Sequence, residues 1–162
     1  FKSFLISVKK YTEYNKNILF DIYKSNLEIE PLSSKKKNFF KKLKKKLSTC
    51  ILTNGIVEIQ KNKVEALQLN DYFDKIFYAR EDGIKFEKPC HHAFYKITKF
   101  FNCNANEVLF VGDSIDKDIN GASAVGMKTV LNYEFLNKPD IKNNKSEYTI
   151  QNIFELDDLL ID

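Results

Sequence analysis

The segment VLFVGDSIDKDING, residues 108–121, is the most informative part of the sequence for the class of fold. Its apolar run ends at Val111 and is followed by Gly112 and Asp113, with a second carboxylate at Asp118. This pattern is typical of a buried parallel strand that delivers an acidic residue to the carboxyl edge of a sheet, where α/β proteins place their ligands. Two carboxylates five residues apart suit a hard divalent cation such as Mg²⁺, which shares its shell with water and substrate phosphate. The stretch therefore favours phosphate chemistry, with a simple capped turn as the structural alternative.

Composition favours a single globular domain over a disordered or membrane-spanning chain. The 162 residues are 43% hydrophobic and 30% charged, which allows a sizeable core. No apolar run approaches the roughly 20 residues that a membrane-spanning helix needs, and no stretch has the pattern of a signal peptide. Three cysteines without paired spacing, Cys50, Cys90 and Cys103, favour a reduced, cytoplasmic setting.

A lysine-rich segment carries most of the positive charge. Eight lysines lie between Lys35 and Lys46, and without them the net charge of +4 becomes −4. Apolar residues between them have the spacing of an amphipathic helix; they are Phe39, Phe40, Leu43 and Leu47. We interpret the lysines as the solvated face, with a surface for phosphate backbones or an acidic partner as the alternative. Arg80 is the only arginine in the sequence, and arginine makes the commonest specific contact to bases, so we expect no nucleic-acid partner.

Strands and helices alternate along the rest of the chain. The apolar runs predict strands at residues 47–52, 76–79, 108–111, 129–131 and 148–150. Helical spacing predicts helices at 57–69, 89–101, 118–125 and 155–160. Pro89 suits the first turn of its helix, and Gly126 is placed to end the next one in the left-handed conformation. The alternation predicts a Rossmann-like α/β fold, with a mainly parallel, doubly wound sheet and flanking helices.

Three short motifs stand in a fixed order along the chain. They are Leu-Thr-Asn-Gly at residues 52–55, Lys88 before Pro89, and Gly-Asp-Ser at 112–114 with Asp118 beyond. Their order and context resemble the haloacid dehalogenase (HAD) superfamily, whose phosphatases and dehalogenases work through an aspartyl intermediate. The resemblance covers residues 31–162, and the tail EYTIQNIFELDDLL is similar to that family's closing strand and helix.

The resemblance implies roles for five residues. Thr53 would bond an oxygen of the transferred phosphoryl group with the amide of Asn54 assisting, and Lys88 would neutralise the phosphate and the attacking carboxylate. Asp113 would ligate Mg²⁺, and Asp118 would complete or support that site. These roles agree with the physics of phosphoryl transfer, which depends on positioning and charge neutralisation. A turn or cap role for Thr53 and plain surface exposure for Lys88 are the structural alternatives.

The family's first motif, Asp-x-Asp-x-Thr or Val after an apolar strand, is missing from the sequence. That motif supplies both the nucleophile and the general acid. Its nearest candidate is ILFDIYKS at 18–25, where Asp21 follows an apolar run but Tyr23 and Ser25 replace the second aspartate and the Thr. The same residues fit a helix better.

The first thirty residues resemble the end of the helical cap that the family inserts between its first two motifs. Helical spacing predicts two helices there, with a break at residues 15–17. We therefore assign residues 1–30 to part of a cap and 31–162 to the HAD-like α/β core without its first strand. Loss of that central strand would leave unpaired edges inside the sheet, so we hypothesise that a natural chain continues upstream with it.

Two other patterns carry less weight. Cys90, His91 and His92 could suggest a metal cluster, but adjacent histidines in a first helical turn point apart, which favours a substrate-side or surface role. Phosphate-receiver domains also combine carboxylates, Thr and Lys on such a fold, but their acidic pair precedes the Thr and Lys, the opposite of the order here.

Two functional classes follow from the sequence. The first is a Mg²⁺-dependent phosphatase of small phosphorylated metabolites, a hydrolase whose nucleophile lies upstream, so that these 162 residues alone are inactive. The alternative is a non-catalytic fragment that binds phosphate or a protein partner. Dehalogenase activity ranks third, because dehalogenation needs no metal and the two aspartates suit one.

Overall fold

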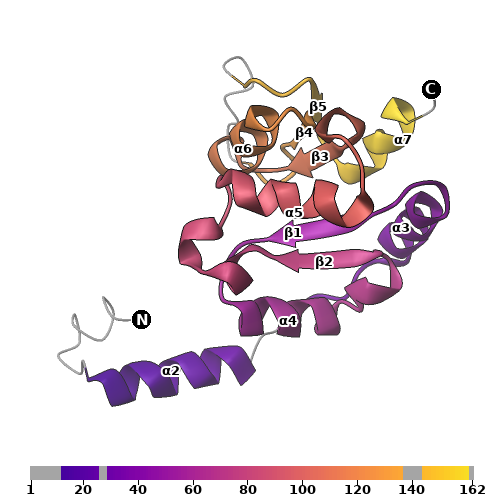
Figure 1. Ribbon diagram of the computed structural model, residues 1–162. Helices are drawn as coiled ribbons and strands as arrows, with labels where there is room; N and C mark the ends of the chain where they lie inside the picture. Colours follow the sequence, from indigo (N-terminus) through magenta and orange to yellow (C-terminus); the bar gives the residue numbers. More distant parts are fainter. Residues whose placement is uncertain (1–11, 26–28, 137–143, 161–162) are drawn as a thin grey trace.

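The computed structural model describes residues 12–25, 29–136 and 144–160 of the chain (Figure 1). Its strands are β1 (Cys50–Thr53), β2 (Lys75–Tyr78), β3 (Leu109–Gly112), β4 (Lys128–Asn132) and β5 (Tyr148–Ile150). Its helices are α2 (Glu13–Ser25), α3 (Ser34–Lys46), α4 (Val57–Ala66), α5 (His91–Phe101), α6 (Asn120–Ala124) and α7 (Leu156–Leu159). Short 3-10 turns and one π-helical turn at Ile115–Ile119 complete the described secondary structure. Within these residues no helix is long and apolar enough to cross a membrane.

Every strand pair is parallel, but the described strands form two sheets instead of one. The first sheet pairs β1 with β2, and the second has the order β3-β4-β5. Among the described residues, β1 and β3 each hydrogen-bond to a neighbouring strand on one side only. The parallel, helix-flanked architecture confirms the predicted Rossmann-like α/β class. The two inner edges show where a continuous sheet is interrupted.

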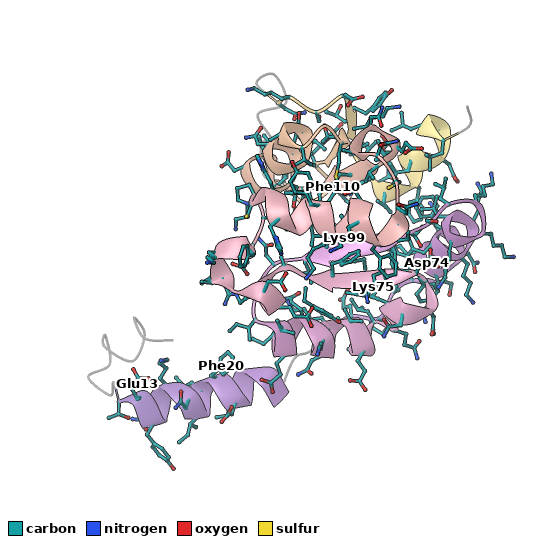
Figure 2. All side chains as sticks on the ribbon, in the orientation of Figure 1. Glu13, Phe20, Asp74, Lys75, Lys99 and Phe110 are labelled. Atoms are coloured by element: carbon teal, nitrogen blue, oxygen red, sulfur yellow. The ribbon has the colours of Figure 1, made fainter. Side chains whose placement is uncertain are left out.

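Helix α5 packs across both sheets and joins them into one core. Its buried Phe94 contacts Phe110 of β3, with ring centroids 5.1 Å apart, and the same apolar cluster includes Leu52 of β1 and Phe77 of β2. Figure 1 shows α5 over the gap between β1 and β3, and Figure 2 labels Phe110 beside it. The predicted core face of this helix is confirmed, since Ala93, Phe94 and Ile97 are buried and Phe101 is partly buried. Hydrophobic burial on α5 thus holds together two sheets whose described strands do not pair with each other.

A second apolar cluster covers the opposite face of the three-stranded sheet. Leu109 and Val111 of β3 point into it, whereas Phe110 between them points to α5, as the two-residue period of a strand requires. Phe39 of α3 is buried there and packs edge-on against Phe154, with centroids 5.3 Å apart. The amphipathic interpretation of the lysine-rich helix is therefore confirmed at Phe39, and Leu47 is the exception because it is 45% exposed.

Several predicted boundaries differ from the structure. Residues 47–49 connect α3 to β1 instead of opening the strand, because α3 continues to Lys46 and Leu47 caps it. Pro89 lies before α5, which begins at His91, and the Lys88–Pro89 peptide bond is cis. The helix predicted for 118–125 is divided into the π-helical turn and α6, while Gly126 has the predicted positive φ of 86°.

Only part of the two-helix prediction for residues 1–30 falls on residues that the structure describes. The helix predicted before residue 15 lies largely outside the described residues. The break predicted at residues 15–17 is wrong, because α2 runs unbroken from Glu13 to Ser25. Asn15 and Asn17 are weak helix formers, but neither has the φ restriction of proline that would end a helix. Figure 1 shows α2 set apart from the α/β body.

Candidate active site

Three polar segments meet at the carboxyl ends of the strands. β1 ends at Thr53, the loop between β2 and α5 carries Lys88, and β3 ends at Gly112 and is followed by Asp113. The first two segments belong to one sheet and the third to the other. The site therefore lies where the two inner sheet edges face each other, which is the usual place for ligands in α/β folds.

Lys88 and Asp118 form the link between the two sheets. Lys88 Nζ lies 2.6 Å from Asp118 Oδ1, and the two side chains are only 12% and 7% exposed. The contact is an ion pair without good hydrogen-bond geometry, because Oδ1 has no hydrogen-bond partner among the described residues. A buried charge pair of this kind is costly to break, since removal of one partner leaves the other desolvated. The structure thus excludes a plain surface position for Lys88.

The turn after β3 is folded around Asp118. The Ser114 N–H donates to Asp118 Oδ2 at 3.1 Å, and the Asp118 N–H donates back to the Ser114 carbonyl at 2.8 Å. Gly112 allows this close approach, because a Cβ at that position would lie 2.3 Å from Asp118 Cβ. The glycine between the apolar strand and Asp113 is therefore required sterically.

Asp113 has a different environment from Asp118. Its residue is exposed, and it lines an open cleft of about 360 Å³ together with Ser114, Ile115, Asp116 and Leu136. The structure places Asp113 and Asp118 at the two ends of one tight turn. Asp113 faces the cleft, whereas Asp118 is buried against Lys88.

Thr53 is held by a residue that the sequence did not single out. Its Oγ1 donates to Gln60 Oε1 on α4 at 2.9 Å, and the carbonyl oxygen of Asn54 lies 3.2 Å away. Gln60 stands seven residues later in the chain, one turn into α4. A helical glutamine seven residues after a strand gives no sequence signal of its own, which explains why it was missed.

Asn54 and Glu87 join the loop after β1 to the loop that carries Lys88. The Lys88 N–H donates to Asn54 Oδ1 at 2.8 Å, and Asn54 Nδ2 donates to the Lys88 carbonyl at 2.9 Å. In the opposite direction, Glu87 Oε1 accepts the Gly55 N–H. The Asn54 side chain thus binds protein backbone, and Glu87 is a second residue that the sequence reasoning missed.

Arg80 fixes the Glu87 carboxylate with two parallel hydrogen bonds. Its Nε and Nη2 donate to Glu87 Oε1 and Oε2 at 2.9 and 3.0 Å. The Arg80 hydrogen bonds hold the pKa of Glu87 below its ordinary value, and the Gly55 N–H acts in the same direction against burial. Bidentate arginine pairs of this type are strong and geometrically specific.

The Cys90-His91-His92 segment forms no metal centre in the described part of the chain. His92 Nε2 lies 2.9 Å from Asp82 Oδ2, which also accepts from Lys96 Nζ at 2.8 Å. His91 packs edge-on against Tyr95. Hydrogen bonds from Lys96 and then His92 lower the pKa of Asp82. The two histidines therefore have different neighbours, as expected from their adjacent positions.

The residues at the end of β3 fit a magnesium ion. No three His, Cys, Asp or Glu side chains gather into a metal-binding group within the described ranges. Mg²⁺, however, is usually held by one or two carboxylates, several waters and substrate phosphate. Asp113 offers an exposed carboxylate oxygen to a hard cation. Asp118 Oδ1 already lies 2.6 Å from the Lys88 ammonium, so Asp118 would support the site through that ion pair.

Comparison with known proteins gives consistent matches. A family model described as haloacid dehalogenase-like hydrolase matches residues 3–132. The glyceraldehyde 3-phosphate phosphatase of Pyrococcus furiosus is 36% identical over 112 residues, which are 69% of this chain and 45% of that protein. The human N-acylneuraminate-9-phosphatase is 29% identical over 140 residues, 84% of this chain and 54% of that protein. The chain spans about half the length of these relatives.

Solved structures match the fold. A HAD phosphatase from Thermococcus onnurineus superposes with a TM-score of 0.71 at 24% identity. The match covers 99% of this chain and 70% of that protein's chain. The HAD-hydrolase YfnB from Bacillus subtilis, solved bound to magnesium, superposes with a TM-score of 0.69 at 24% identity. That match covers 78% of this chain and 54% of the YfnB chain.

Proposed function

Because the chain belongs to the haloacid dehalogenase-like hydrolase family, we propose that the intact protein is a Mg²⁺-dependent phosphatase of small phosphorylated metabolites. The observation that carries the proposal is the buried Lys88–Asp118 pair, which brings the ends of two separate sheets to one point beside the Asp113 cleft. The phosphatase relatives support the same reaction class. We also propose a cytoplasmic setting and no nucleic-acid partner.

Each residue contributes to positioning and charge neutralisation. The Lys88 ammonium, held at the site by Asp118, would neutralise a phosphoryl oxygen and the attacking carboxylate. The Thr53 hydroxyl would turn from Gln60 to donate to a phosphoryl oxygen. Asp113 would hold Mg²⁺, with Asp118 supporting the site. The bound ion would neutralise charge that develops on the transferred group.

We propose that the nucleophile and the general acid lie on a strand upstream of Phe1. The motif that supplies them is missing from the sequence, and the inner edges of β1 and β3 are those that an additional parallel strand would pair. An aspartate at the carboxyl end of such a strand would lie between Thr53 and Asp113. It would attack phosphorus to form an aspartyl-phosphate, a second aspartate would protonate the leaving group, and water would then release phosphate. Residues 1–162 alone would be inactive.

A non-catalytic phosphate-binding or protein-binding role is the second candidate. The missing first motif favours it, because residues 1–162 would supply a binding half of the site without a nucleophile. Dehalogenase activity ranks lower, since the Asp113 and Asp118 carboxylates fit a cation that dehalogenation does not need.

Phosphate release from a panel of small phosphomonoesters, measured with and without Mg²⁺, tests the proposal. The full-length gene product should release phosphate only with Mg²⁺, and Asp113→Asn should abolish the activity. Asp158→Asn, an exposed change on α7, is the matched control and should retain full activity. A folded full-length protein with an intact upstream Asp-x-Asp motif and no phosphatase activity would favour the non-catalytic candidate.

A further inference from the structure

Two loops of the site bind each other reciprocally through side chains and backbone. Asn54, from the loop after β1, makes two hydrogen bonds to the backbone N–H and C=O of Lys88, at 2.8 and 2.9 Å. Glu87, from the loop of Lys88, accepts the backbone N–H of Gly55. We name these three hydrogen bonds the loop clasp. Each loop contributes one side chain to the backbone of the other, so movement of one loop must move the other.

Arg80 braces the loop clasp from a third segment. It stands in the 3-10 turn Ala79–Asp82 that follows β2, and its two hydrogen bonds hold both oxygens of Glu87. Glu87 is 18% exposed on its side chain and Arg80 is 30% exposed. A surface ion pair alone contributes little, but here the carboxylate is also fixed against a backbone amide.

The position of the loop clasp gives it a functional meaning. The Lys88 ammonium extends from the clasped backbone to Asp118, in the π-helical turn that follows β3 of the other sheet, and Thr53 directly precedes Asn54. Strand hydrogen bonds do not connect the two sheets among the described residues. The clasp therefore fixes the backbone on both sides of the groups that must meet a phosphoryl oxygen, and small misplacement of such groups is costly for rate.

We propose that Glu87, braced by Arg80, and Asn54 are positioning residues that set the places of the Thr53 hydroxyl and the Lys88 ammonium for phosphoryl transfer; the catalytic part of this inference rests on the proposed function. In this role neither side chain needs to contact the phosphoryl group. They act through the backbone of Gly55 and Lys88.

Residue-specific lysine acetylation of the full-length protein, followed by mass spectrometry, tests the clasp without any need for activity. Glu87→Ala should raise the labelling rate of Lys88 several-fold, because its ammonium is no longer held against Asp118. Lys44 is the internal control, because it is part-buried beside Asp74 and donates to the Phe73 carbonyl at 3.2 Å, away from the clasp. Its labelling should not change. An equal rise at both lysines would show general loosening and overturn the proposal, as would no rise at Lys88.

Conservative variants separate the clasp from simple loss of charge. Glu87→Gln keeps a carbonyl oxygen for the Gly55 N–H, so Lys88 labelling should return close to the wild-type rate. Asn54→Asp keeps the acceptor for the Lys88 N–H but loses the donor to its carbonyl, so it should raise Lys88 labelling. If Glu87→Ala does not fold, Asn54→Asp alone tests whether the loop clasp positions the Lys88 ammonium. Wild-type labelling in Asn54→Asp would then overturn the proposal.

Steady-state kinetics of the Glu87 variants tests the catalytic part of the proposal. Glu87→Ala should lower kcat about 10- to 100-fold with a smaller change in KM, and Glu87→Gln should restore most of kcat. A full-length wild type without phosphatase activity would contradict the proposed function, whereas the acetylation result would still decide whether the clasp positions Lys88. Unchanged kcat in an active Glu87→Ala enzyme would overturn the positioning role.

Discussion

At the residue scale, Gly112 shows how one missing side chain shapes the site. A Cβ at this position would lie 2.3 Å from Asp118 Cβ and 2.7 Å from Asp118 Cγ, and the Asp118 side chain is buried. Gly112→Ala should therefore displace Asp118 and lower the free energy of unfolding by about 1–3 kcal/mol. Urea unfolding measures this loss. Ser123→Ala, an exposed change on α6, is the control and should stay within about 0.5 kcal/mol of wild type. Equal stability of both variants would mean that the turn is not packed as described.

Glu87 makes stability depend on pH. Its folded-state pKa lies below the ordinary value of 4.5, chiefly because of the Arg80 hydrogen bonds. As the pH falls, Glu87 therefore becomes protonated in the unfolded protein at a higher pH than in the folded protein. The stabilisation by the Glu87 carboxylate is fully present above pH about 4.5 and is lost as the pH falls through the folded-state pKa. The difference in unfolding free energy between wild type and Glu87→Gln should be largest near neutral pH and shrink in acid.

Urea unfolding of both proteins from neutral to acidic pH checks this dependence. Ser123→Ala, an exposed change on α6 that removes no ionisable group, is the control and should give a difference that does not vary with pH. A wild-type advantage over Glu87→Gln that grows as the pH falls would contradict the sign of the pKa shift.

At the scale of elements, the lysine-rich helix α3 owes its place to its apolar side. Phe39 is 5% exposed and packs against Phe154 and the three-stranded sheet. Phe39→Ala should destabilise the protein by about 3–5 kcal/mol, because it removes a buried ring and leaves a cavity. Thermal or urea unfolding gives the value. Phe135→Ala is the matched control, since that ring is 74% exposed, and it should cost about 0.5 kcal/mol or less. Similar losses from both changes would contradict the burial of α3.

The sequence predicted strands and helices well where a few neighbouring residues determine the structure. The apolar runs located all five described strands to within a few residues, and Gly126 has the positive φ that was predicted for it. The boundary at Leu47 was wrong because a helix end and a short strand compete for the same apolar residues. The loop clasp could not be predicted, because Asn54 and Lys88 are 34 residues apart and meet only after β1 and β2 have paired.

At the scale of the whole molecule, the interrupted sheet and the half-complete site belong together. The inner edges of β1 and β3 lie on either side of the Lys88–Asp118 ion pair. From the family resemblance, the sequence predicted a missing central strand and assigned expected roles to Thr53, Lys88, Asp113 and Asp118, which stay predictions. It could not show that α5 would hold the two sheets together through Phe94 and Phe110, because that contact depends on tertiary packing.

We propose that residues 1–162 supply the binding half of a phosphatase whose nucleophile lies upstream of Phe1. The decisive experiment for this claim is acid-quenched turnover of the full-length protein, followed by peptide mapping of the phosphoryl adduct. We predict an adduct on an aspartate upstream of Phe1, which forms only with Mg²⁺ and is lost in Lys88→Met. An adduct on any residue between Phe1 and Asp162, or turnover by these 162 residues alone, would contradict the claim.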